Sequence, residues 1–211
     1  MIALIDYGMG NLASVAKVFE FLGGRIQITS DPRVVRKAKG LVFPGVGAFG
    51  EAMEELKERG LVEPILNSIQ EDKPFLGLCL GLQLLFAASE ESPGIKGLGI
   101  LPGKVRRLPW VPGLKIPHIG WNQVAFVRGS KANGNPLLKG IPNGAFMYFV
   151  HSFYADPIDK EMIAAMTEYG DRFPSILWNG ANLWATQFHP EKSQRWGLKL
   201  LKNFLSQVAS C

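Results

Sequence analysis

Cysteine is scarce in this sequence: the 211 residues include only Cys79 and Cys211. Cys79 lies in a predicted turn and Cys211 is the last residue, so we expect no disulfide. Paired cysteines and histidines at metal-ligand spacing are also missing, because His118, His151 and His189 are scattered singly. We therefore predict no metal site. In a reducing compartment, a lone mid-chain cysteine is either a buried apolar group or a nucleophile.

Long hydrophobic runs are missing as well. No run reaches the roughly 18 apolar residues that a membrane span needs. Residues 1–5 lack a basic leader, and Asp6 ends the run too early for a signal peptide. The 47% hydrophobic and 19% charged content is typical of a compact folded protein. We predict a cytoplasmic protein without a membrane partner, with one domain over residues 1–211.

The sequence carries no large excess of either charge; its net charge is +5. Basic residues gather in residues 33–39 and 192–202. Such runs can bind nucleic acid, but solvated helix faces explain them more often, and no nucleic-acid-binding motif accompanies them. We predict no nucleic-acid partner; an acidic protein partner is the more economical functional reading.

What the sequence does contain is an alternation of strand and helix signals in its first half, which predicts a parallel sheet with helices on both faces. The expected strands are residues 2–5, 25–29, 40–43 and 75–78, and the expected helices are residues 12–22, 49–59, 61–70 and 80–88.

After residue 97, glycine and proline punctuate shorter runs, which indicates a mixed or antiparallel extension of the same sheet. An amphipathic helix is expected over residues 193–208. The predicted fold class is therefore α/β: a doubly wound, mostly parallel sheet with an antiparallel extension in the second half. The expected strands of the extension are residues 103–108, 123–127, 145–153, 163–169, 175–178 and 182–187.

The segment around Cys79 has the pattern of a strand that enters a sharp turn and leaves as a helix. Gly77 and Gly81 flank the cysteine and let the backbone fold tightly around a nucleophile. A thiol needs help to ionise near pH 7; a helix start and a base such as His189 both favour the thiolate. Glu191, two residues later on an expected extended segment, is placed to orient that imidazole.

An acyl-transfer site also needs donors for the oxyanion of its tetrahedral intermediate. The N–H of Leu80, one residue past the nucleophile, is one candidate. The second is the oxyanion loop, residues 44–47 (PGVG), which follows an expected strand and includes Val46 and Gly47. Chain order separates this pattern from α/β-hydrolases, in which the acid precedes the histidine. The papain-type cysteine signature is missing.

These motifs resemble a known family. Residues 77–83 (GLCLGLQ) resemble the nucleophile elbow of class I, triad-type glutamine amidotransferases, and residues 187–191 (QFHPE) resemble their histidine–glutamate motif. Four further blocks resemble the members that work in histidine biosynthesis, and the resemblance spans nearly the whole chain. These blocks are residues 6–11 (DYGMGN), 117–122 (PHIGWN), 148–152 (YFVHS) and 189–193 (HPEKS).

The resemblance implies that Cys79, His189 and Glu191 hydrolyse glutamine to glutamate and ammonia through a thioester, without a cofactor. It also implies a heterodimer with a (β/α)8-barrel cyclase. That cyclase uses the ammonia to make imidazole glycerol phosphate and an aminoimidazole carboxamide ribonucleotide. In similar proteins, glutamine hydrolysis is slow until the partner binds its ligand.

The same resemblance assigns further residues. Glutamine would be held by Gly47 and Gln83 and by the backbone at Ser152 and Phe153. The residues expected to face the cyclase are Asn11, Trp121, Tyr148 and Lys192.

Other interpretations stay open at the level of sequence. Trp121 and Tyr148 are also compatible with packing roles, and Lys192 with a solvated charge. A related class I amidotransferase that supplies ammonia to a different synthase would carry the same triad. A non-catalytic module that retained the fold is disfavoured by the intact Cys79, His189 and Glu191.

Overall fold

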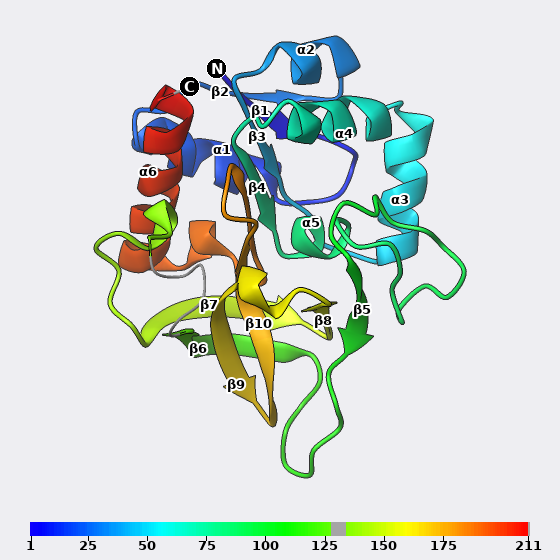
Figure 1. The fold of residues 1–211 in the computed structure, drawn as a ribbon, viewed down its shortest axis with the longest axis vertical. Coiled ribbons are helices and arrows are strands. Elements are labelled where there is room, and N and C mark those ends of the chain that lie inside the picture. The colour runs from blue at the N-terminus through cyan, green and yellow to red at the C-terminus, as the bar shows by residue number, and fades with distance from the viewer. Residues whose placement is uncertain (128–133, 211) are drawn as a thin grey trace.

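The computed structural model describes residues 1–127 and 134–210, so Cys211 lies outside the described residues. Nine strands form one sheet in the order β2-β1-β3-β4-β11-β10-β9-β6-β7, and β5 pairs with β8 in a small second sheet (Figure 1). The strands are β1 (Ile2–Ile5), β2 (Ile26–Thr29), β3 (Gly40–Phe43), β4 (Phe75–Leu78), β5 (Gly103–Arg107), β6 (His118–Phe126), β7 (Ala145–His151), β8 (Phe153–Pro157), β9 (Ile163–Tyr169), β10 (Asp171–Trp178) and β11 (Leu183–Thr186).

The helices cover both faces of the parallel strands, as Figure 1 shows. They are α1 (Leu12–Phe21), α2 (Pro32–Lys37), α3 (Phe49–Glu58), α4 (Val62–Gln70), α5 (Leu80–Gln83) and α6 (Gln194–Ser210), with short 3-10 turns η1 (Pro136–Leu138), η2 (Lys160–Met162) and η3 (Pro190–Lys192). No helix in the described part of the chain is long and apolar enough to cross a membrane. The cytoplasmic location stays a prediction.

The parallel half of the sheet places the two sequence motifs side by side. Strands β2, β1, β3, β4 and β11 pair in parallel, with Thr186 opposite Leu78 at the ends of β11 and β4. The carboxyl ends of parallel strands meet at one edge of a sheet, where α/β proteins bind their ligands. Cys79 follows β4 directly, and His189 follows β11 by three residues. The fold therefore brings together residues 110 positions apart.

The strands after β11 in the sheet order pair antiparallel: β11 with β10, β10 with β9, β9 with β6, and β6 with β7. These strands lie below the parallel part in Figure 1. The predicted α/β class, with its antiparallel extension in the second half, is confirmed.

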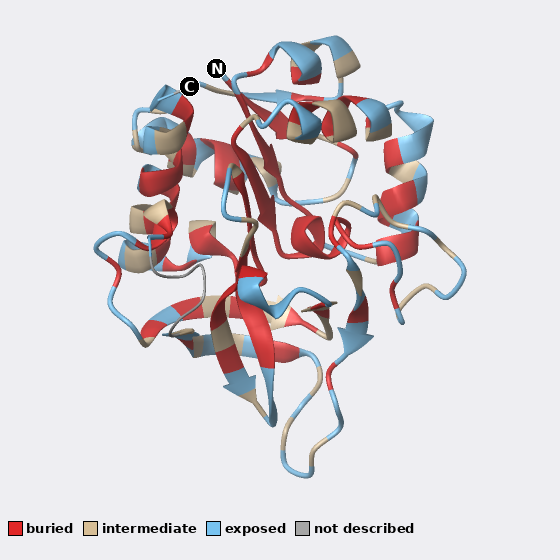
Figure 2. Cartoon of the chain, viewed as in Figure 1, coloured by how far each residue is buried: buried red, intermediate tan, exposed pale blue. Residues whose placement is uncertain are grey.

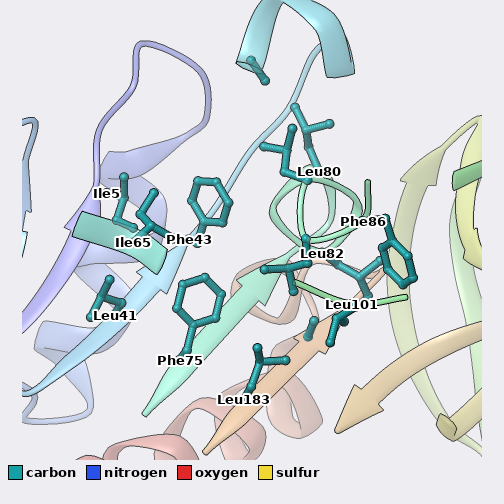
Figure 3. Close-up of a cluster of buried hydrophobic side chains, with 14 of the residues drawn as sticks. Ile5, Leu41, Phe43, Ile65, Phe75, Leu80, Leu82, Phe86, Leu101 and Leu183 are labelled. Atoms are coloured by element: carbon teal, nitrogen blue, oxygen red, sulfur yellow. The ribbon is translucent and has the colours of Figure 1, made fainter. Parts of the chain in front are cut away.

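Alternation along the central strands builds two cores. In β1, Ala3 and Ile5 face one cluster with α2–α5, while Ile2 and Leu4 face the other with α1 and α6. Figure 2 shows the buried strands flanked by helices whose outer faces are exposed. Figure 3 shows Leu80 and Leu82 of α5 beside Phe43 and Phe75 of the strands. Packing into this first cluster anchors the turn that carries the cysteine.

Several predicted bounds are wrong. The helix expected over residues 80–88 ends at Gln83, because the carbonyls of Leu84 and Leu85 accept N–H groups from Leu98, Ile100 and Leu101. The returning chain therefore replaces the next helical turn.

Other differences concern strands and one missed helix. The helix α2 (Pro32–Lys37) went unpredicted, although Asp31 caps it and Pro32 begins it. The strand expected over residues 123–127 begins at His118, and that expected over residues 175–178 begins at Asp171. The run over residues 145–153 divides into β7 and β8. Gly120 and Pro174 masked the strand pattern in the missed starts of β6 and β10.

Candidate functional site

Cys79 occupies a strained turn between β4 and α5. Its φ of 52° and ψ of −106° lie in a region that non-glycine residues rarely adopt, and the residue is only 5% exposed. A Cβ on Gly81 would overlap the Phe43 carbonyl oxygen, and one on Gly77 would come within 3.1 Å of the Gly81 carbonyl oxygen. Close backbone approach thus requires glycine at position 81 and leaves little room for a side chain at position 77, as the sequence pattern predicts.

Backbone hydrogen bonds tie the cysteine and histidine segments to neighbouring strands. The N–H of Cys79 donates to the Thr186 carbonyl oxygen at 2.8 Å, which ties the turn to β11. The N–H of His189 donates to the Tyr148 carbonyl oxygen at 2.9 Å, which ties that segment to β7. Both side chains are therefore positioned by strands rather than by free loops.

His189 and Glu191 form a buried pair. The imidazole Nδ1 lies 2.9 Å from the carboxylate Oε1, and the two side chains are 4% and 3% exposed. The geometry comes from the 3-10 turn η3 (Pro190–Lys192), so the extended segment expected here is wrong. Burial opposes a charge on the ring, but the Cys79 sulfur and then the Glu191 carboxylate raise the pKa of His189 to about 10. His189 is thus a strong acceptor for a thiol proton.

The sulfur has two further polar neighbours. Cys79 Sγ lies 3.7 Å from the Val150 carbonyl oxygen and 3.7 Å from Nε2 of the fully buried Gln187. The Gln187 Oε1 accepts a hydrogen bond from Gln83 Nε2 at 3.3 Å. Gln187 was missed as a site residue, although it lies in the QFHPE motif, two residues before His189.

A cavity of about 250 Å³ opens over Cys79. Its lining includes six residues that the sequence predicts for the oxyanion or for glutamine: Val46, Gly47, Leu80, Gln83, Ser152 and Phe153. Gln83 Nε2 donates to the Phe153 carbonyl oxygen at 2.8 Å. The lining also includes Glu91, Pro117, Val150 and His151, which sequence reasoning did not assign to the site.

The predicted oxyanion donors lie at this cavity. The N–H groups of Leu80, Val46 and Gly47 donate to no acceptor in the described residues. Gly47 has a φ of 112°, a conformation that favours glycine. Helix α5 spans only four residues, so little macrodipole supports the thiolate. Of the features expected to favour the thiolate of Cys79, the nearby N–H groups and His189 are left.

Three of the four predicted interface residues cluster beside the site. Trp121, which is 46% exposed, meets the Tyr148 ring edge-on with 5.9 Å between the ring centroids, and Lys192 Nζ lies 5.9 Å from the Tyr148 ring centroid. Asn11 is exposed; its side chain caps α1, and it borders a small cavity together with His189 and Lys192. All four are therefore near the sheet edge that carries the triad.

The comparisons with known proteins agree with this geometry. The model of the family "Glutamine amidotransferase class-I" matches residues 3–208. The chain belongs to the class I glutamine amidotransferase family. Two relatives of this amidotransferase are named imidazole glycerol phosphate synthase subunit HisH. The protein from Syntrophotalea carbinolica is 50% identical over 209 residues (97% of this chain, 98% of that protein), and the one from Moorella thermoacetica is 50% identical over 203 residues (96% and 93%).

The narrower resemblance is thereby confirmed: this amidotransferase is a homologue of HisH subunits. A solved structure with the same fold is a glutamine amidotransferase from Thermotoga maritima. Its TM-score is 0.69 at 17% identity, and the match covers 100% of this chain and 98% of that one. At that identity the likeness shows the fold alone.

The protonation of the three histidines is a testable property of the amidotransferase site. His151 Nδ1 lies 2.9 Å from the Phe153 carbonyl oxygen and must donate to it, so its Nε2 accepts from His118 Nδ1 at 3.1 Å. Burial lowers the pKa of His151 to about 3 and that of His118 to about 4. Both rings are therefore neutral at pH 7, while His189 is protonated.

We expect ring NMR spectra between pH 5 and pH 8 to show one imidazolium and two neutral imidazoles, with no ring titrating. Only three histidines are present, so assignment is direct. In Cys79→Ala, the His189 resonances should begin to titrate at lower pH, because the sulfur that does most to raise the pKa of His189 is gone. A wild-type ring that titrates near pH 6.5 would contradict this assignment.

Proposed function

We propose that this chain hydrolyses L-glutamine to glutamate and ammonia through a thioester on Cys79, and supplies the ammonia to a cyclase subunit. The observation that carries the proposal is that Cys79 and the buried His189–Glu191 pair meet at the edge of the parallel strands, where the Cys79 sulfur raises the pKa of His189. The family and the HisH relatives support the same conclusion. We also propose that residues 1–211 are one amidotransferase domain.

The geometry suggests how the first half of the reaction proceeds. Before the attack, His189 already holds the thiol proton as an imidazolium, and the thiolate of Cys79 attacks the amide carbon of glutamine. The oxyanion then formed accepts N–H groups from Leu80 and from the oxyanion loop at Val46 or Gly47. As the intermediate collapses, the C–N bond breaks and His189 returns the proton to the departing ammonia. The product is a glutamyl thioester on Cys79.

The second half uses the same groups. His189 takes a proton from water, which attacks the thioester carbonyl, and the sulfur leaves as glutamate forms. Glu191 keeps the imidazole oriented through the bond at Nδ1. Both amide hydrogens of Gln83 already have acceptors in Phe153 and Gln187, so its Oε1 is the atom left to accept from the substrate's ammonium group.

The partner that we propose is a (β/α)8-barrel cyclase, joined in a heterodimer at the face that carries Asn11, Trp121, Tyr148 and Lys192. The name of the relatives, a synthase subunit, supports a partner of this kind. The product would then be imidazole glycerol phosphate, formed together with an aminoimidazole carboxamide ribonucleotide.

Turnover of glutamine with and without the cyclase tests the proposal. We expect slow hydrolysis by the chain alone and faster hydrolysis once the cyclase and its nucleotide ligand are added, with one imidazole product formed per glutamate. A chain that hydrolyses glutamine but transfers no ammonia to this cyclase would favour the related amidotransferase of a different synthase. A chain that hydrolyses none in the complex would reject the amidotransferase function.

A further inference from the structure

Contacts from elsewhere in the chain hold the start of the oxyanion loop, residues 44–47, and the start of the helix that follows it. At that helix, the Glu91 carboxylate accepts from the Phe49 N–H at 2.9 Å, and Ser92 Oγ accepts from the Gly50 N–H at 3.0 Å. These bonds fix the start of α3, which has no side-chain cap of its own. The start of the loop is held differently.

At the start of the loop, the Tyr7 hydroxyl donates to the buried Pro44 carbonyl oxygen at 2.7 Å. Within the described ranges, Tyr7 is the only donor to this carbonyl. A Cβ on Gly45 would overlap the Tyr7 hydroxyl, so the loop backbone passes directly against it. Removing the hydroxyl would leave the Pro44 carbonyl buried and unpaired.

Tyr7 is itself rigidly placed. It is fully buried, it follows β1, and its ring meets the Phe43 ring at 5.4 Å between centroids. Burial, and after it the nearby Cys79 sulfur, raises the pKa of Tyr7 far above its ordinary value, so the hydroxyl keeps its proton and stays a donor. The sulfur and the loop are therefore both close to this one side chain.

We propose that Tyr7 is a positioning residue for the oxyanion loop. Its hydroxyl holds the Pro44 carbonyl and thereby fixes the orientation of the peptide bonds that follow, including the N–H groups of Val46 and Gly47. This inference rests on the proposed amidotransferase function. Tyr7 acts through the loop and touches neither substrate nor sulfur in a reacting role.

The test compares two reactions of Cys79 in the complex with cyclase and its nucleotide. Hydrolysis of glutamine passes through an oxyanion and needs the loop, whereas alkylation by iodoacetamide forms no oxyanion and reports only the thiolate. For Tyr7→Phe we expect kcat for glutamine to fall about tenfold, the effect of losing one hydrogen bond of ordinary strength. KM should change less than about twofold, and the alkylation rate should be unchanged.

Tyr169→Phe is the matched control, because the Tyr169 hydroxyl also donates to a backbone carbonyl, that of Lys115, at 2.7 Å. It should leave both reactions unchanged, and thermal melting checks that both variants fold. Equal kcat in Tyr7→Phe and wild type, or an alkylation rate that falls in parallel with kcat, would overturn the inference. A wild-type complex without glutamine turnover would reject the proposed function, and this inference with it.

Discussion

Cys79→Ala should abolish glutamine-dependent synthesis while leaving ammonia-dependent synthesis intact. Without the sulfur, no thioester forms, and removing a nucleophile of this kind lowers turnover by roughly 10⁴-fold or more. The fold should persist, because alanine lacks only the sulfur of cysteine and adds no atom to the buried site. The measurement is product formation by the complex, first with glutamine and then with an ammonium salt as the only nitrogen source.

Cys211→Ala is the control for this experiment, because it removes the one other cysteine of the sequence. It should behave as wild type with both nitrogen sources. Glutamine-dependent synthesis retained by Cys79→Ala would reject Cys79 as the nucleophile. Loss of ammonia-dependent synthesis in the same variant would mean that the substitution damages the complex rather than the chemistry.

Gly81→Ala should be strongly destabilising. The added Cβ would overlap the Phe43 carbonyl oxygen, which is backbone of a central strand and has little room to move. Overpacking against a rigid neighbour costs about 3 kcal/mol, which in a chain of this size lowers the melting temperature by on the order of 10 °C. Phe43 is followed directly by the oxyanion loop, so any shift there should also lower glutamine turnover.

Gly60→Ala is the matched control, since its Cβ would meet no atom within 4 Å although φ is +63°. We expect this variant to lose only about 1 kcal/mol of stability, the cost of the positive φ alone. Equal melting temperatures of the two variants would show that close packing at the elbow is not what requires glycine at position 81.

The features predicted well from the sequence are those with a local cause. The strand over residues 2–5 and the strand over residues 75–78 were placed correctly, because Asp6 ends the first short apolar run and Pro74 precedes the second. The same holds for the elbow, where glycines flank Cys79. The placement of His189 near Cys79 depends on β4 and β11 pairing in parallel, which no local pattern specifies. The expectation that these two residues lie together rested on the QFHPE motif itself.

The features missed have long-range causes. Helix α5 stops at Gln83 because residues 98–101 return to bond the next carbonyls, a contact between distant segments. Gln187 bonds the sulfur because it directly follows β11, which pairs with the strand that precedes Cys79, and Glu91 bonds the start of α3 from a position 42 residues away. The anchoring of Pro44 by Tyr7 likewise joins residues 37 positions apart. Such pairings follow from the fold and leave no periodic signal.

The central claim is that the sulfur of Cys79 carries the glutamyl group during turnover. Rapid acid quenching of the complex during glutamine hydrolysis, followed by peptide mass spectrometry, measures this directly. The account predicts one glutamyl adduct, on the peptide that contains Cys79, which disappears once glutamine is exhausted. Continued turnover with the adduct on another residue would contradict it.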